Sequence, residues 1–153
     1  MDSLLFSLLI SNPDISEFSE FRKLFEIDVV ELIIQHFDKN ETERKALADN
    51  LERLKQMQKE GAEINRLAEN DIEFHRILGK ASKNLVTEKI YNFIIDFMQK
   101  SIKTTHELSK QRGEIAAKSH QYIVEAIESR NIEVCRNAIE ESVDTWSELQ
   151  DAL

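Results

Sequence analysis

Apolar residues recur along this chain at intervals of three and four positions, which is the spacing of one face of an α-helix. The pattern divides into six long segments, at about residues 16–38, 40–61, 64–79, 84–102, 116–127 and 131–149. No stretch of useful length alternates with a period of two. We therefore predict an all-α fold, an antiparallel bundle of six to seven helices. Residues 1–12 are expected to form a short N-terminal helix and residues 13–153 the bundle domain.

Residues that favour helix ends stand between the predicted helices. The capping-box pattern, an N-cap side chain followed three positions later by Glu, occurs at Asp14 and at Asn40. With only 3 Gly and 1 Pro in the chain, the sequence predicts long helices with short connections. Further helix ends are indicated at Ser82 or Asn84, at Asn131 and at Gly61.

The charged residues give the chain an acidic balance. Against 20 Lys and Arg stand 29 Asp and Glu, a formal net charge of -9, and the basic residues form no cluster. A phosphate backbone or an anionic membrane surface repels such a chain, so we expect it to bind neither DNA nor a membrane by itself. The single cysteine, Cys135, excludes an intrachain disulfide and fits a cytoplasmic location; we interpret it as a small core hydrophobe.

Three ionisable residues interrupt the apolar faces of two predicted helices. Asp71 and His75 stand four positions apart on the third long helix, which places them on neighbouring turns about 6 Å apart along the axis. His120 stands on the apolar stripe of the fifth long helix. One carboxylate and two imidazoles in an apolar interior need partners, and a divalent metal ion satisfies all three. The alternative is a hydrogen-bonded cluster of Asp and His without a metal.

The remaining histidines and the common enzyme motifs are less informative. His36 and His106 lie near apolar stripes without a second acidic or His residue at ligand spacing, so we interpret them as packed or edge histidines. A Gly-rich phosphate loop, a Cys-x-x-Cys pair and a nucleophile elbow are all missing from the sequence. We therefore expect that the chain is not an enzyme.

The residues around these positions resemble the motifs of one protein family. The stretch from Asp71 to His75, followed by residues 81–84, is similar to the central motif of the C-terminal ligand-binding (FCD) domain of FadR-type GntR transcription regulators. Residues 20–26 resemble the family's Arg and Glu helix opening, and residues 120–127 resemble its second histidine motif. The resemblance covers roughly residues 16–149, nearly the whole chain.

The resemblance implies a metal-dependent sensor domain that forms a homodimer. In such a domain one Asp and three His hold a metal, often zinc, nickel or manganese, and a small carboxylate effector binds beside it. Asp71, His75 and His120 match the first three ligand positions, whereas Ser142 stands where the family has its last histidine. Because a hydroxyl is a poor ligand for these metals, the resemblance implies a site with open positions for water or effector.

Two further residues join Ser142 as candidates for effector contact. Arg22 lies on the stripe of the first long helix and can reach inward to hold a carboxylate at two points. Its alternative partner is Glu26, four positions on. Asn84 is the other candidate, with helix capping as its alternative role.

These features favour an effector-sensing and dimerisation domain of a GntR-type regulator, with DNA contacted only through a winged-helix domain absent from this chain. Its absence fits either a truncated protein or a stand-alone sensor. We expect the dimer interface on the first or the fourth long helix. Two other functions stay open, a non-haem metalloenzyme that uses the two-His, one-carboxylate set and a metal-free helical interaction domain.

Overall fold

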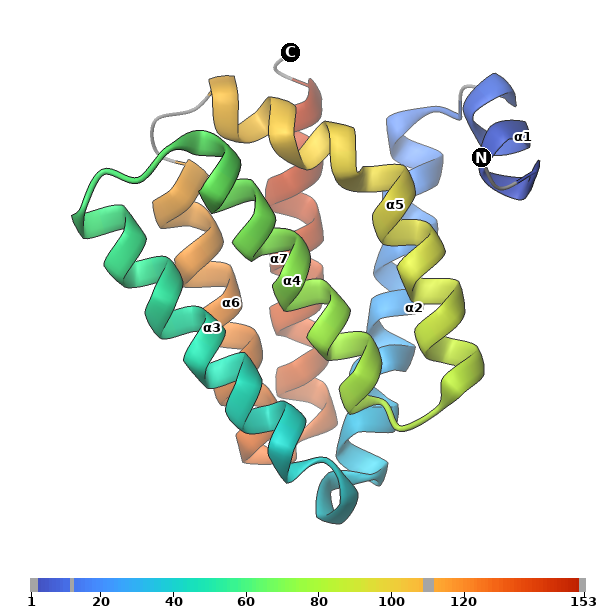
Figure 1. The fold of residues 1–153 in the computed structure, drawn as a ribbon. Helices are drawn as coiled ribbons and strands as arrows, with labels where there is room; N and C mark the ends of the chain where they lie inside the picture. The colour runs from blue at the N-terminus through green and yellow to red at the C-terminus, as the bar shows by residue number, and fades with distance from the viewer. Residues whose placement is uncertain (1–2, 12, 109–111, 152–153) are drawn as a thin grey trace.

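The computed structural model describes residues 3–11, 13–108 and 112–151. Its elements are α1 (Ser3–Ser11), α2 (Ile15–Gln35), the short 3-10 helix η1 (Phe37–Lys39), α3 (Glu41–Lys59), α4 (Ile64–Ala81), α5 (Leu85–Leu108), α6 (Arg112–Ser129) and α7 (Ile132–Asp151) (Figure 1). These described ranges contain no β-strand, so the prediction of an all-α bundle is confirmed. Helices α2 to α7 correspond in order to the six predicted segments. In the described ranges, no helix combines the length and the apolar character that crossing a bilayer requires.

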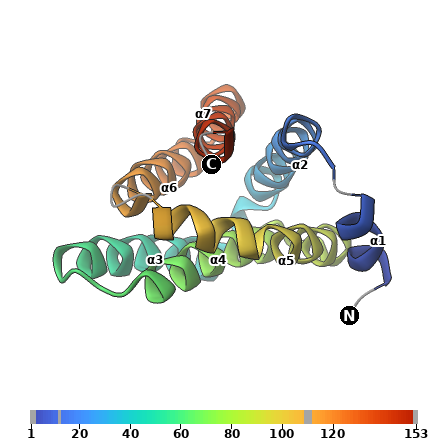
Figure 2. The same cartoon turned by 90° about the horizontal axis from the view of Figure 1, so that it is seen from above.

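The six long helices lie in two layers, which are separated in the view from above (Figure 2). One layer holds α3, α4 and α5 side by side, and the other holds α6, α7 and α2. Because α4 and α7 are the middle helices of their layers, side chains on their inner faces are far from solvent. The core fills the space between the layers and includes the fully buried Ile33, Phe74, Tyr91, Ile95 and Val143.

Helix caps account for most of the predicted helix ends. Asp14 accepts a hydrogen bond from a backbone N–H of the first turn of α2 at 2.8 Å, and its own N–H donates to Glu17, which completes the predicted capping box. Asn84 and Asn131 cap α5 and α7 by accepting from backbone N–H groups at 3.1 and 3.0 Å. Gly61 follows α3 with a φ of 65°, the left-handed conformation in which a helix commonly ends and Gly is favoured.

Asn40 has a different role from the predicted cap. Its side chain makes no capping hydrogen bond to α3 and is fully buried. The amide nitrogen instead donates to the carbonyl oxygens of Ile33 at 2.9 Å and Ala81 at 2.8 Å, in the last turns of α2 and α4. Since the last four carbonyls of a helix have no partner within it, Asn40 satisfies two of them and joins the two layers. The predicted capping box at Asn40 is therefore wrong.

We expect Asn40→Ala to lower the free energy of unfolding by about 2–4 kcal/mol, because it leaves two buried carbonyl oxygens without their hydrogen-bond donor. Asn131→Ala is the matched control, since Asn131 is exposed and its loss removes only a helix cap, about 1 kcal/mol. Urea unfolding of the two variants beside the wild type measures the difference. Equal losses would mean that the two buried hydrogen bonds of Asn40 stabilise the fold no more than a helix cap does.

Candidate metal centre

Helices from the two layers bring the three predicted ligand residues together. Asp71 and His75 stand one turn apart on the inner face of α4, and His120 stands on the inner face of α6. All three are buried, with at most 4% of the residue exposed. One ligand atom from each of them lies within 4.8 Å of the other two. The structure therefore gathers the three residues at one point, and their role as metal ligands stays a prediction.

Asp71 lies at the centre of this group. Its Oδ1 is 3.4 Å from Nε2 of His75 and 3.2 Å from Nε2 of His120. Ligand atoms at about 2.0–2.1 Å from a tetrahedral zinc ion stand about 3.3 Å from one another, so these separations fit a divalent metal ion. Parallel stacking on the ring of Phe74, with centroids 3.8 Å apart, holds the ring of His120 in place.

Hydrogen bonds on the far side of His75 determine which of its ring nitrogens carries a proton. The hydroxyl of Tyr91 donates to Oε1 of Glu26, so the hydroxyl oxygen accepts the 2.8 Å hydrogen bond from Nδ1–H of His75. Neutral His75 then has no proton on Nε2, the nitrogen that faces Asp71. A lone pair opposite a carboxylate oxygen is repulsive unless a cation lies between them. That cation is either a second proton on the ring or a metal ion.

Glu26 and Tyr91 support His75 from outside, and neither was predicted as a site residue. Glu26 pairs with Nε of Arg22 at 3.0 Å and lies 3.3 Å from Nδ1 of His75. Burial alone would raise the pKa of Glu26, but the charge of Arg22 and hydrogen bonds with His75 and Tyr91 lower it to about 2. A metal-bound imidazole commonly donates a hydrogen bond from its other ring nitrogen to a carboxylate, which orients the ring. The sequence did carry a signal, because one stripe of α2 contains Arg22, Glu26, Val29 and Ile33.

His106 is buried, in agreement with the interpretation of it as a packed histidine, but it also has an acidic partner that the sequence did not indicate. Its Nε2 lies 3.0 Å from Oδ2 of Asp71, and only 3% of the residue is exposed. Spacing could not reveal this contact, because the two residues are on different helices, 35 positions apart. The available signal was the apolar stripe of α5, which leads to His106 through the buried Tyr91, Ile95, Met98 and Ile102.

Burial and hydrogen bonding act in opposite directions on the acid and base of this site. Burial alone would raise the pKa of Asp71, but hydrogen bonds with His106, His120 and His75 hold it well below its ordinary value of 3.8. Burial alone would lower the pKa of His75, but hydrogen bonds with Asp71 and Glu26 raise it above 6.5. Without a metal ion, the favoured state therefore has an ionised Asp71 and a protonated His75.

The residues predicted for effector contact lie in different surroundings. Arg22 is buried, its guanidinium lies 4.9 Å from the ring centroid of Trp146, and its Nη1 has no hydrogen-bond partner among the described residues. Ser142 is half-buried on α7. Asn84 is exposed, and its side chain caps α5, the role given as its alternative. Cys135 is buried in the core, as predicted.

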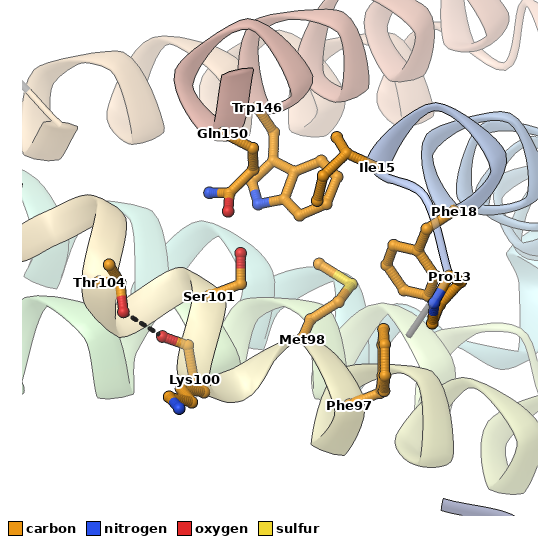
Figure 3. Close-up of a pocket in the computed structure, with 10 residues that line it drawn as sticks. All are labelled: Pro13, Ile15, Phe18, Phe97, Met98, Lys100, Ser101, Thr104, Trp146 and Gln150. Atoms are coloured by element: carbon orange, nitrogen blue, oxygen red, sulfur yellow. Dashed lines mark hydrogen bonds between the residues drawn. The ribbon is translucent and has the colours of Figure 1, made fainter. Parts of the chain in front are cut away.

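A cavity of about 310 Å³ lies between the start of α2, the middle of α5 and the end of α7 (Figure 3). Apolar side chains, among them Phe18, Met98 and Trp146, form most of its wall. The indole N–H of Trp146 and the amide N–H of Gln150 are buried there without an acceptor in the described part of the chain. Such donors suit a ligand that brings its own oxygen atoms. Ser142, four positions before Trp146, stands on the same face of α7.

One protein-family model matches most of the chain. The family model described as the FCD domain matches residues 17–145. This range includes Asp71, His75, His106 and His120, and also Ser142. No curated protein matches the chain.

In the metal-free protein, we expect thermal stability to fall as the pH rises through the raised pKa of His75. The proton on His75 interacts with Asp71 and Glu26, so its contribution is complete below about pH 6.5 and is lost as the ring deprotonates. Thermal unfolding in the presence of a chelator, from about pH 6 to about pH 9, measures this loss. His75→Gln should flatten the decline, and an unchanged decline in that variant would assign it to other groups.

Proposed function

We propose that this chain, which belongs to the FCD domain family, senses a small carboxylate beside a divalent metal ion held by Asp71, His75 and His120. FCD domains are the regulatory, effector-binding domains of GntR-type transcription regulators. One observation carries the metal: Nδ1 of His75 is engaged by Tyr91, so its Nε2 faces the Asp71 carboxylate at 3.4 Å and needs a cation between them. Zinc, nickel or manganese would accept the lone pair of Nε2 and balance the charge of Asp71.

A carboxylate effector is proposed because of the charge of this centre. A divalent ion and one carboxylate leave a net charge of about +1, which attracts an anion. Ser142, at the position where the family resemblance implies a histidine, leaves room for an effector oxygen on the ion. Arg22 supplies a second anchor in this proposal, since its buried Nη1 has no partner among the described residues.

The cavity beside Trp146 is the proposed place for the organic part of the effector. The ring of Trp146 lines the cavity and also lies against the guanidinium of Arg22. A ligand in the cavity meets the N–H groups of Trp146 and Gln150, which suit carboxylate or hydroxyl oxygens. At about 310 Å³ the cavity is at the small end of ligand pockets, so the proposal is a small organic acid.

A metalloenzyme and a metal-free interaction domain are the alternatives. Hydrolytic or oxidative chemistry requires an available acid or base beside the ligands. Glu26 lies 3.3 Å from His75, but Arg22 and Tyr91 engage its carboxylate, which favours a sensor over an enzyme. In a metal-free domain a second proton on His75 would replace the ion.

We also propose that two copies of the chain pair through the outer faces of α2 and α5. Large apolar side chains of these helices, 44–68% exposed, form what we name the α2–α5 patch: Phe21, Leu24, Leu85, Val86 and Ile90. The two halves adjoin, because Phe21 stacks on Phe25, which contacts Tyr91 edge-on. Exposed apolar patches of this kind favour association with another protein surface.

The proposed function predicts that metal and carboxylate bind together. Protein purified without chelator or a nickel-affinity tag should contain a divalent ion, and at least one of acetate, succinate and citrate should raise its melting temperature. The same acid should change the emission of Trp146, the only Trp of the chain. Asp71→Ala and His120→Ala should abolish the metal and both responses, as measured by metal analysis, thermal unfolding and fluorescence.

His36→Ala is the control for that experiment, because the ring of His36 bonds only the carbonyl of Ser82 among the hydrogen bonds described for it. It should retain the metal and both responses. Metal-free protein would favour the interaction domain, turnover of an added acid would favour the enzyme, and responses unchanged in both site variants would place the effector elsewhere.

We expect Leu24→Asp and Val86→Asp each to convert the dimer to a monomer, because an unpaired charge in an apolar interface is unfavourable. Light scattering after size-exclusion chromatography measures the mass at matched concentrations. Ile64→Asp is the control, since Ile64 is 40% exposed but lies on α4, outside the α2–α5 patch. A wild-type protein that stays monomeric at high concentration contradicts this interface.

A further inference from the structure

Asp71 faces imidazole rings on both of its carboxylate oxygens. Oδ1 faces Nε2 of His75 and of His120, whereas Oδ2 faces Nε2 of His106 at 3.0 Å. The atoms that fit one metal ion belong to Asp71, His75 and His120. His106 therefore approaches the same carboxylate from the side that the proposed metal centre does not use.

We propose that His106 is a positioning residue, whose Nε2–H donates to Oδ2 of Asp71 and keeps Oδ1 directed at the metal ion. This inference rests on the metal centre proposed above. It adds a second residue of α5, after Tyr91, to the supports of a centre whose proposed ligands lie on α4 and α6, and it gives His106 a role different from that of the ligands.

The surroundings of His106 indicate where its proton lies. Its Nδ1 is buried and has no hydrogen-bond partner among the described residues. A proton on Nδ1 would have no acceptor, so the single proton of the neutral ring is favoured on Nε2, where Oδ2 of Asp71 accepts it. Water does not compete for this hydrogen bond, because both side chains are only 1% exposed.

Holding Oδ2 has a consequence for the ion. A carboxylate fixed through one oxygen offers the metal only the other, so the protein supplies one oxygen and two nitrogen ligands. An ion with three protein ligands retains a position for water or for the effector. If His106 bound the ion itself, one Asp and three His would close a tetrahedral site. The position of His106 therefore decides whether the centre is open to an effector.

The affinity of the full chain for Zn²⁺, measured by competition with a chromophoric chelator, separates positioning from ligation. His106→Ala should weaken binding by about 10- to 100-fold, the effect of losing a hydrogen-bonding partner of a ligand. His106→Gln should restore most of the affinity, because its amide supplies an N–H donor but is a poor zinc ligand. His36→Gln makes the same change at a half-buried histidine bonded to the Ser82 carbonyl and should leave the affinity unchanged.

The visible spectrum of the Co²⁺-loaded protein provides a second readout. It should be the same in the wild type and in His106→Gln, because no ligand has been removed. If both His106 variants lose the same affinity and the cobalt spectrum changes, His106 is a metal ligand and its proposed positioning role is overturned. Circular dichroism in the presence of chelator tests that each variant is folded.

Failure of this inference can be told from failure of the metal centre itself. A wild-type chain that binds no Zn²⁺ overturns both. If the wild type binds Zn²⁺ and His106→Ala binds it equally tightly, only the proposed role of His106 is overturned.

Discussion

The buried carboxylate of Asp71 is the constraint on which the interior of this domain depends. An ionised group that is only 1% exposed is strongly unfavourable without partners. Three helices supply those partners, His75 from α4, His106 from α5 and His120 from α6. Because these helices belong to both layers, the carboxylate is satisfied only when the layers have assembled in the correct register. The contacts that stabilise this charge therefore also favour the correct packing of the two layers.

From this carboxylate a chain of buried polar contacts leads outward to the cavity. It passes from His75 to Tyr91 and Glu26, then to Arg22, whose guanidinium lies against Trp146. Hydrogen bonds join His75, Tyr91 and Glu26, whereas Nη1 of Arg22 and the indole N–H of Trp146 lack acceptors among the described residues. Buried donors without acceptors are unfavourable in an apolar interior. An anion that binds there would accept their hydrogen bonds and so be stabilised.

Periodicity predicted the helices and placed Asp71, His75 and His120 in the core. It could not identify the partners of those side chains across the layers. His106 and Glu26 stand on apolar stripes like their neighbours, and only the relative rotation of α5 and α2 brings them to Asp71 and His75. The predicted capping box at Asn40 was wrong for a related reason. An N-cap pattern in the sequence does not indicate whether the start of the helix is buried between the ends of two other helices.

Ser142 stands on the face of α7 that also carries two residues of the proposed effector cavity. Ser142, Trp146 and Gln150 follow one another at four-residue spacing, so one face of α7 offers a hydroxyl and two N–H donors instead of an imidazole. His106 does not take the place of the histidine that the family resemblance implies at Ser142, because it contacts the other oxygen of Asp71. A closed tetrahedral set of four protein ligands leaves a zinc ion no position for an effector oxygen. In the proposed function, an incomplete ligand set leaves a position on the ion for an effector oxygen, and the contact of Trp146 with Arg22 links the cavity to the residues that support the ligands.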